Sequence, residues 1–220
     1  PAILADRIYA ADGYGRLEAF DRFSGNRQWR VQLKEEQAGF LGQSDVMDTT
    51  EPSFVTGGVA AGDGMVFLGT TNGEVVEFSP TDGEELWRGD VGSEVLAPVA
   101  IGDDLVFAQT LDGSLLALEA DSGQFRWRFD AQVPVLTLRG TSTPVVDGDT
   151  VFAGFANGSL VAIRTENGEP LWEHRVMLPE GRSELERMVD VDASALVRGP
   201  LVYAVAYQGN VRAIRRADGN

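Results

Sequence analysis

The sequence predicts an all-β fold, a β-propeller built from four-stranded antiparallel blades, of which about five are present. Three observations predict it: a hairpin glycine that recurs along the chain, a second glycine ten residues after it, and a tryptophan four residues beyond the second glycine. The hairpin glycines lie 58, 40, 45 and 51 residues apart, from position 15 to positions 73, 113, 158 and 209. A period of about 40–50 residues made of short strands is typical of propeller blades.

The three recurring positions can be read directly from the chain. They are Gly15, Gly73, Gly113, Gly158 and Gly209, then Gly25, Gly83, Gly123, Gly168 and Gly219, then Trp29, Trp87, Trp127 and Trp172. A fifth tryptophan in this series would fall at position 223. Each blade of a propeller buries its two faces only against its neighbours, so the tryptophans are predicted to pack blade against blade rather than to hold a cofactor.

The third unit, residues 95–130, shows the strand pattern most clearly. Its apolar and small or polar residues alternate with period two, and no helical pattern competes. Asp112-Gly113 supplies the positive φ that a tight hairpin needs. The predicted strands are Ala97–Ala100, Leu105–Thr110, Leu115–Glu119 and Phe125–Phe129.

The other units follow in order along the chain. The predicted blades cover residues 3–33, 57–91, 95–130, 141–176 and 193–220. The first is predicted to be clipped at its N-terminal strand, and the last stops before its fourth strand. Residues 34–53 are polar, and a short helix and a loop are equally compatible with them. Either the last blade is completed by the first residues of the chain, or these blades belong to a larger ring.

Composition argues against several classes of function. The net charge of −16 disfavours binding to nucleic acid or to an anionic lipid surface. The absence of cysteine excludes disulfides and thiolate metal sites. The single histidine, His174, has no nucleophile or carboxylate partner that the pattern supports, and the phosphate-loop, zinc-protease and serine-hydrolase motifs are absent. The residues therefore predict no catalytic, cofactor or metal site.

Two connections between blades carry residues that a simple connection does not need. The first connection contains Leu136, Leu138 and Arg139. Two apolar side chains beside a guanidinium are typical of an interface hot spot. Asp190 and Asp192, two residues apart, are predicted to point to the same side of an extended segment, where they repel unless a cation meets them. Each connection links a fourth strand to the next first strand, so both are predicted to lie on one face of the disc. The alternative is that both merely cap the blades.

The chain also resembles a known family. The matching pieces are IYAADGYGRLEAFDRFSGNRQW from Ile8, LTLRGTSTPVV at Leu136–Val146, and SELERMVDVDASALV at Ser183–Val197, which is followed by VYAVAYQGNVRAI. These pieces resemble BamB, the family of propeller lipoproteins in the outer-membrane β-barrel assembly (BAM) machinery of Gram-negative bacteria. The LTLRG and DVD connections are much more distinctive than the glycine and tryptophan repeat.

The resemblance implies a non-enzymatic scaffold that helps β-barrels fold and insert. In that family the two connections carry residues that meet a POTRA domain of BamA, which implicates Leu136, Leu138, Arg139, Asp190 and Asp192 here. It further implies eight blades, of which this chain resembles the first five, and a location on the periplasmic face of the outer membrane. The family's lipid anchor requires an N-terminal cysteine that this chain lacks. The resemblance leaves open whether unfolded outer-membrane proteins also bind to this chain.

Two alternatives remain at this point. The repeat is also similar to that of quinoprotein dehydrogenases, and ALEADSGQFRW at Ala117–Trp127 matches their blade motif imperfectly. Those enzymes need a calcium site and commonly adjacent cysteines over the quinone, which nothing in this chain supplies. A propeller that binds a sugar or peptide in its central channel is the other alternative.

Overall fold

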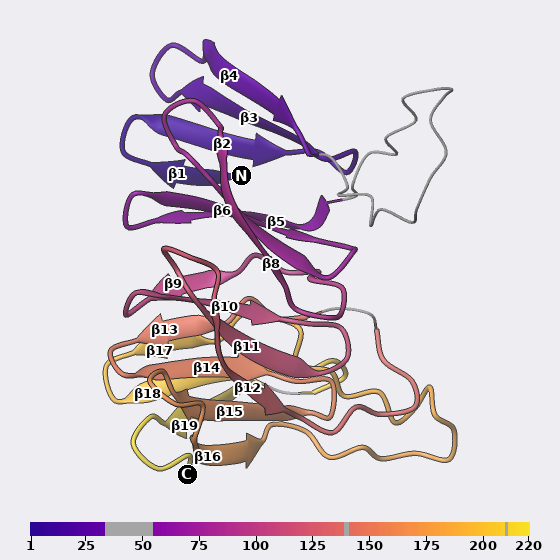
Figure 1. The fold of residues 1–220 in the computed structure, drawn as a ribbon. Helices are drawn as coiled ribbons and strands as arrows, with labels where there is room; N and C mark the ends of the chain where they lie inside the picture. The colour runs from indigo at the N-terminus through magenta and orange to yellow at the C-terminus, as the bar shows by residue number, and fades with distance from the viewer. Residues whose placement is uncertain (34–54, 139–140, 210) are drawn as a thin grey trace, which may run out of the picture.

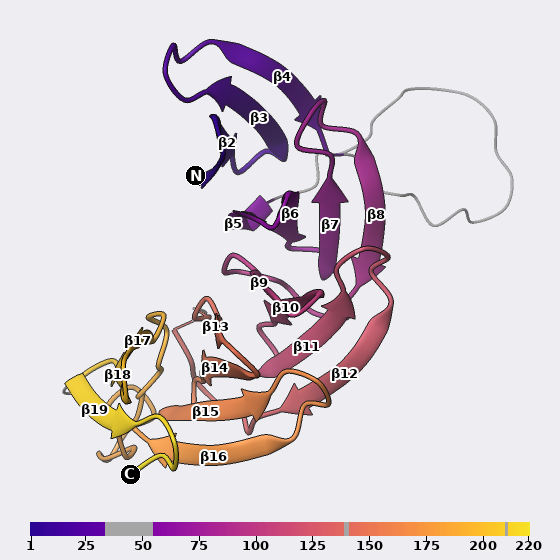
Figure 2. The same cartoon turned by 90° about the vertical axis from the view of Figure 1, so that its left-hand side faces the viewer.

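A computed structural model of the chain describes residues 1–33, 55–138, 141–209 and 211–220, and these contain strands and turns without a helix. In this part of the chain the strands form five separate antiparallel sheets (Figure 1), which lie one after another in chain order (Figure 2). Within each sheet, neighbours in sequence are neighbours in space. The predicted all-β architecture of four-stranded antiparallel units is therefore confirmed.

Each sheet is a simple meander. The first contains β1 (Ala2–Leu4), β2 (Arg7–Ala11), β3 (Arg16–Asp21) and β4 (Arg27–Gln32), and the second β5 (Val55–Gly62), β6 (Met65–Thr70), β7 (Glu74–Phe78) and β8 (Glu85–Asp90). The third contains β9 (Ala100–Gly102), β10 (Leu105–Gln109), β11 (Ser114–Glu119) and β12 (Phe125–Asp130). The fourth contains β13 (Val145–Asp147), β14 (Thr150–Gly154), β15 (Ser159–Arg164) and β16 (Pro170–Arg175), and the fifth β17 (Leu196–Arg198), β18 (Leu201–Val205) and β19 (Val211–Arg215).

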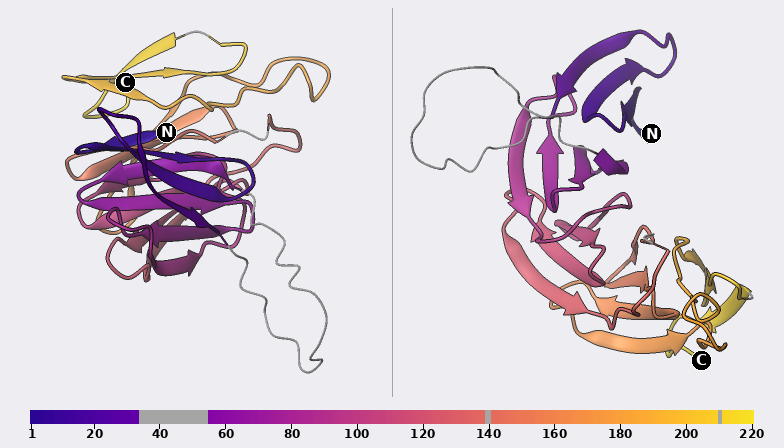
Figure 3. Two further views of the ribbon diagram at one scale, coloured as in Figure 1. Left: turned by 90° about the horizontal axis from the view of Figure 1, so that it is seen from above. Right: turned by 90° about the vertical axis from the view of Figure 1, so that its right-hand side faces the viewer.

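The sheets fan out around an arc (Figures 2 and 3). The first strand of each sheet lies on the inner side of the arc, and the fourth strands β4, β8, β12 and β16 form its outer rim. Because every sheet has this order, each of the three inner sheets turns one broad face toward the sheet before it and the other toward the sheet after it. This is the arrangement of blades in a propeller.

The core consists of layers between successive sheets. One aromatic residue recurs at the third position of the second strand, as Tyr9, Phe67, Phe107 and Phe152, and all four are buried. Each ring lies 5.6–5.8 Å, centroid to centroid, from the tryptophan of its own sheet, in a tilted arrangement. Tilted aromatic pairs at this distance are favourable beyond the apolar area that they bury.

The tryptophans connect each sheet to the next. Every indole Nε1–H donates to a backbone carbonyl of the following sheet: Trp29 to Pro80 at 3.1 Å, Trp87 to Ala120 at 2.9 Å, Trp127 to Thr165 at 2.7 Å and Trp172 to Arg216 at 2.8 Å. The ring itself covers the second glycine of that following sheet, three residues beyond the carbonyl. The predicted packing of tryptophans from blade to blade is confirmed, and we call each contact a tryptophan–glycine lock.

Those glycines are required for two reasons. At Gly123 the backbone has a φ of +68°, a value that residues other than glycine rarely adopt. In addition, a Cβ at this position would lie 2.5 Å from the Trp87 ring. Gly25 has a similar φ of +71° but nothing within 4 Å of its Cβ position. In the hairpin series, the positive φ of the last repeat belongs to Gln208, at 57°, instead of Gly209.

Two predicted strands differ from the structure. The first strand of the third sheet is Ala100–Gly102 rather than Ala97–Ala100. Pro98 has no N–H to donate to a ladder, so pairing with β10 begins only after it. The first sheet has its full set of four strands, because Ala2–Leu4 pairs with β2, so the expected clipping was wrong. The alternatives considered for residues 34–53 lie outside the described residues.

Candidate partner-binding surface

Two long connections project from the same side of the stack. The first connection, residues 131–144, joins β12 to β13, and the second connection, residues 176–195, joins β16 to β17. Both extend to the right in Figure 1, where the fourth strands end. Since strand direction alternates within every meander, the fourth strands all end on this side, which we call the connection face. The prediction that both connections lie on one face agrees with this arrangement.

The first connection exposes apolar side chains. Val135 is 93% exposed, Leu136 41% and Leu138 37%. The segment begins where the Ala131 N–H donates to Gly113 O at 3.0 Å, which anchors it to the β10–β11 hairpin. Arg139, the third predicted contact residue of this segment, lies outside the described residues.

The second connection contains one tight turn and one buried stretch. Ser183 and Glu186 exchange hydrogen bonds as in a capping box: the Ser183 Oγ accepts from the Glu186 N–H, and the Glu186 carboxylate accepts from the Ser183 N–H, both at 3.3 Å. The Arg187 N–H also donates to Ser183 O at 3.2 Å, so these residues form a single tight turn. The following residues, Met188, Val189, Asp190 and Val191, are all buried.

Asp190 joins the two connections. Its side chain is 1% exposed, and its Oδ1 accepts the backbone N–H of Leu138 at 3.0 Å. Its backbone carbonyl accepts the Tyr207 N–H at 2.8 Å, which links the same residue to the fifth sheet. Among the described residues, Oδ2 of this carboxylate is buried without a hydrogen-bond partner. The Leu138 backbone is thus held by a residue 52 positions away.

Burial is the main influence on the ionisation of Asp190. Desolvation raises the pKa of its carboxyl above the usual value, and the negative charge of Asp192 raises the pKa further. The hydrogen bonds from the backbone N–H groups of Leu138 and of Asp190 itself act in the opposite direction but do not cancel the effect of burial.

The expectation that Asp190 and Asp192 share one side of an extended segment was wrong. Asp190 is buried and directed to the first connection, whereas Asp192 is exposed. Alternation with period two does not apply, because four consecutive residues from Met188 to Val191 are buried, and Val189 and Val191 both pack on the fourth sheet, at Gly158 and Gly154. A Cβ at Gly154 would lie 2.5 Å from the Val191 carbonyl, so the absence of a side chain there admits this close approach.

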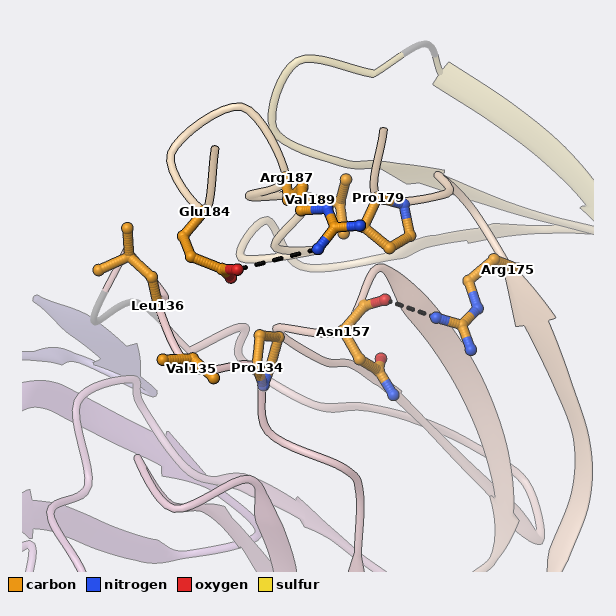
Figure 4. A pocket seen from close by; sticks show the side chains of 9 residues that line it. All are labelled: Pro134, Val135, Leu136, Asn157, Arg175, Pro179, Glu184, Arg187 and Val189. Carbon is orange, nitrogen blue, oxygen red and sulfur yellow. Dashed lines mark hydrogen bonds and ion pairs between the residues drawn. The ribbon is translucent and has the colours of Figure 1, made fainter. Parts of the chain in front are cut away.

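A groove of about 300 Å³ lies between the two connections (Figure 4). Its lining residues are Pro134, Val135, Leu136, Asn157, Arg175, Pro179, Glu184, Arg187 and Val189. Figure 4 shows the first connection on one side of the groove, with Glu184, Arg187 and Pro179 of the second opposite it. Neither Arg175 nor Arg187 was predicted as a site residue from the sequence. Arg187 lies inside the SELERMVDVD segment, but nothing in the sequence shows that Arg175, the last residue of β16, is close to it.

Other types of site find no support in the described residues. No group of three or more His, Asp or Glu side chains in them is placed to hold a metal ion. His174 lies between the fourth and fifth sheets, with Nδ1 2.6 Å from Gly219 O. The same residues contain no helix of the length and apolarity needed to cross a membrane.

Fold and surface together define a class of protein. The repeated locks and meandering sheets are those of a β-propeller of the quinoprotein-like repeat type, and its distinctive surface is a pair of joined connections. Residues 13–220 match the family described as outer membrane protein assembly factor BamB. The chain belongs to this family.

Relatives with curated names agree. The BamB proteins of Xanthomonas campestris pv. campestris and Escherichia coli K12 are 38% and 36% identical over 219 residues, which is 100% of this chain and 52% and 54% of theirs. That of Pseudomonas aeruginosa is 40% identical over 214 residues, covering 97% of this chain and 52% of its own. The chain therefore spans about half the length of the curated relatives it matches.

Solved structures show the same fold. BamB from Moraxella catarrhalis superimposes with a TM-score of 0.85 at 27% identity, covering 100% of this chain and 61% of that one. A quinohemoprotein alcohol dehydrogenase from Comamonas testosteroni reaches a TM-score of 0.73 at 16% identity, covering 100% of this chain and 41% of the enzyme. At that identity the likeness to the dehydrogenase concerns the fold alone.

Proposed function

We propose that this chain is a propeller part of the BAM machinery and docks on the periplasmic POTRA region of BamA through its connection face. The observation that carries the proposal is the hydrogen bond from the Leu138 N–H to Asp190 Oδ1, because it joins the two most distinctive segments into one surface. Membership of the BamB family supports the assignment to this machinery.

The residues of this surface have separate roles in the proposal. Leu136 and Leu138 supply apolar area that becomes buried when the partner docks, and half-exposed leucines grouped on one face are typical of interaction sites. Asp192 is exposed and pairs with a basic side chain or a backbone N–H of the partner. Arg139 pairs with an acidic side chain or a carbonyl group.

Asp190 acts differently from the other four. Its carboxylate is buried and already accepts the N–H of Leu138, so it positions the first connection instead of touching the partner. Removing it would free the Leu138 backbone, and the two leucines would lose their fixed arrangement before docking. Preorganisation of this kind improves affinity because less freedom is lost on binding.

The proposal extends to the whole protein. The five sheets are five blades, at about residues 3–33, 57–91, 95–130, 141–176 and 193–220, of an eight-bladed ring. The protein acts without catalysis, holds no cofactor, and sits at the periplasmic face of the outer membrane through an N-terminal lipid anchor outside this chain. Coverage of about half of the relatives' length is consistent with a part of such a ring.

Calorimetric titration with the purified POTRA region of BamA from the same source tests the proposal. Binding by the parent chain and at least tenfold weaker binding by Arg139→Glu would support both the partner and the surface, since breaking a charged interfacial hydrogen bond typically costs about 2–5 kcal/mol. Circular dichroism first establishes that both proteins keep their β structure. Equal binding would keep the partner and reject the surface, and no binding by the folded parent would reject the partner.

A further inference from the structure

We infer that the groove between the two connections is an anchor site for one apolar side chain of the docked partner, with a partner carboxylate beside it held by Arg175 and Arg187. This inference rests on the proposed docking to BamA and adds to it the chemistry of the partner segment. Neither arginine belongs to the set of contact residues that the sequence suggested.

The walls of the groove suit an apolar side chain. Pro134, Val135 and Leu136 line it from the first connection, and Pro179 and Val189 from the second. A volume of about 300 Å³ accommodates a large aliphatic or aromatic side chain. Proline and β-branched residues lose little conformational freedom when a partner side chain settles between them, which favours a preformed pocket.

The polar groups of the groove favour an anion. Two guanidinium groups and one carboxylate, that of Glu184, line it, in a protein whose net charge is −16. The Arg187 Nη1 lies 3.8 Å from Glu184 Oε1, at the long limit of an ion pair, with both side chains more than half exposed. Such a pair contributes little stability and leaves most of the hydrogen-bonding capacity of Arg187 free.

Arg175 is equally available. Its Nη1 donates to Asn157 O at 2.9 Å, and in the described part of the chain no carboxylate forms an ion pair with it (Figure 4). A guanidinium has five N–H donors, so one carbonyl partner leaves room for a carboxylate. Because the carbonyl fixes one side of the group, the remaining donors are oriented before the partner arrives.

These features select one occupant among the possible ones. A second copy of this chain also carries a charge of −16, and repulsion between two such molecules disfavours self-association. A free small anion would not use the apolar walls. A protein segment that presents an apolar residue next to an aspartate or glutamate uses both, and the groove is continuous with the proposed docking surface through Leu136.

The test uses a matched pair of arginines. Arg187 and Arg164 each have one carboxylate at 3.8 Å, Glu184 and Glu169 respectively, but Arg164 ends β15 on the side of the stack opposite the connection face. Arg175→Glu, Arg187→Glu and the control Arg164→Glu are titrated with the POTRA region of BamA. The chain has no cysteine, so Val135→Cys can be labelled uniquely with an environment-sensitive fluorophore that reports burial of the groove.

We expect each groove variant to bind about tenfold more weakly, because each loses a charge-assisted hydrogen bond and gains repulsion. The control should stay within twofold of the parent, and the label at position 135 should move to a less polar environment on binding. Parent-like affinity of both groove variants, or an unchanged label during binding, would overturn the anchor site but keep the proposed docking. Failure of the parent itself to bind would overturn both.

Discussion

The tryptophan–glycine locks and the Asp190–Leu138 contact hold segments of the chain together in opposite ways. Each lock combines a neutral indole hydrogen bond with the burial of an aromatic ring over a glycine, and it is repeated four times. The contact between the connections occurs once and depends on a buried carboxylate with one oxygen unpaired in the described structure. The first kind of contact builds the stack, whereas the second shapes a surface.

The difference has an energetic basis. Neutral groups that are buried with their hydrogen bonds made stabilise a fold at every pH of interest. A buried carboxylate costs desolvation, and hydrogen bonds from backbone N–H groups compensate only part of that cost. We therefore expect changes in the locks to lower the stability of the fold, and changes in the connections to act mainly on binding.

The largest expected effect is the loss of a buried lock. Trp127→Ala removes a nearly buried ring and leaves Thr165 O without its donor, so unfolding in denaturant should show a loss of about 3–5 kcal/mol. Trp172→Ala is the control, because the same contact at the last pair of sheets is more exposed, and its loss should be smaller. Equal losses, or a loss below about 1 kcal/mol for Trp127→Ala, would contradict the role of burial.

A pair of glycines separates backbone strain from packing. Gly25→Ala places a side chain at a φ of +71° in open space, and strain of about 1–2 kcal/mol is expected. Gly123→Ala has a similar φ of +68° but puts the new Cβ 2.5 Å from the Trp87 ring, so a further 1–3 kcal/mol, roughly, is expected from overpacking. Thermal or denaturant unfolding measures the difference, and equal losses for the two variants would show that the lock tolerates a methyl group.

Asp190 gives the contact between the connections a dependence on pH. Its folded-state pKa is raised, so the folded protein binds this proton more tightly than the unfolded chain does, and the contribution of Asp190 to stability decreases as pH rises from about 4 through the raised pKa. Asp190→Asn retains an oxygen to accept the Leu138 N–H but cannot ionise. The variant should therefore gain stability relative to the parent over this pH range.

Unfolding of both proteins in denaturant between pH 4 and pH 8 measures that difference. Only the difference is informative, because carboxyls such as Asp112 and Asp130 have lowered pKa values and act in the opposite direction in both proteins. A difference between parent and variant that does not change with pH would contradict the buried, ionisable role of Asp190.

The smallest effect on stability is expected at the exposed residues of the surface. Leu136→Ser should change the free energy of unfolding by about 0.5 kcal/mol or less, since the side chain is 41% exposed. The same variant should weaken binding to the POTRA region of BamA. A large loss of stability would show that Leu136 serves the fold rather than the surface.

The two regions also differ in how far the sequence predicts them. Trp127 and Gly123 recur at fixed spacing, and a repeat that cannot bury itself alone implies contacts between neighbours. The burial of Asp190 was not predictable in this way, because its hydrogen-bond partner is 52 residues distant and the segment does not repeat. The two arginines that line the groove, Arg175 and Arg187, were not predictable for the same reason, since they come from different elements.

The central claim, that the two connections act as one docking surface, is tested most directly by a double-mutant cycle. The affinities of the parent, Leu138→Ala, Asp190→Ala and the double variant for the POTRA region of BamA would be measured by calorimetry. If Asp190 positions Leu138, the leucine substitution should cost much less in the Asp190→Ala background, with a coupling free energy of about 1 kcal/mol or more. Losses that add to within about 0.5 kcal/mol would mean that the two connections bind independently and would contradict the claim.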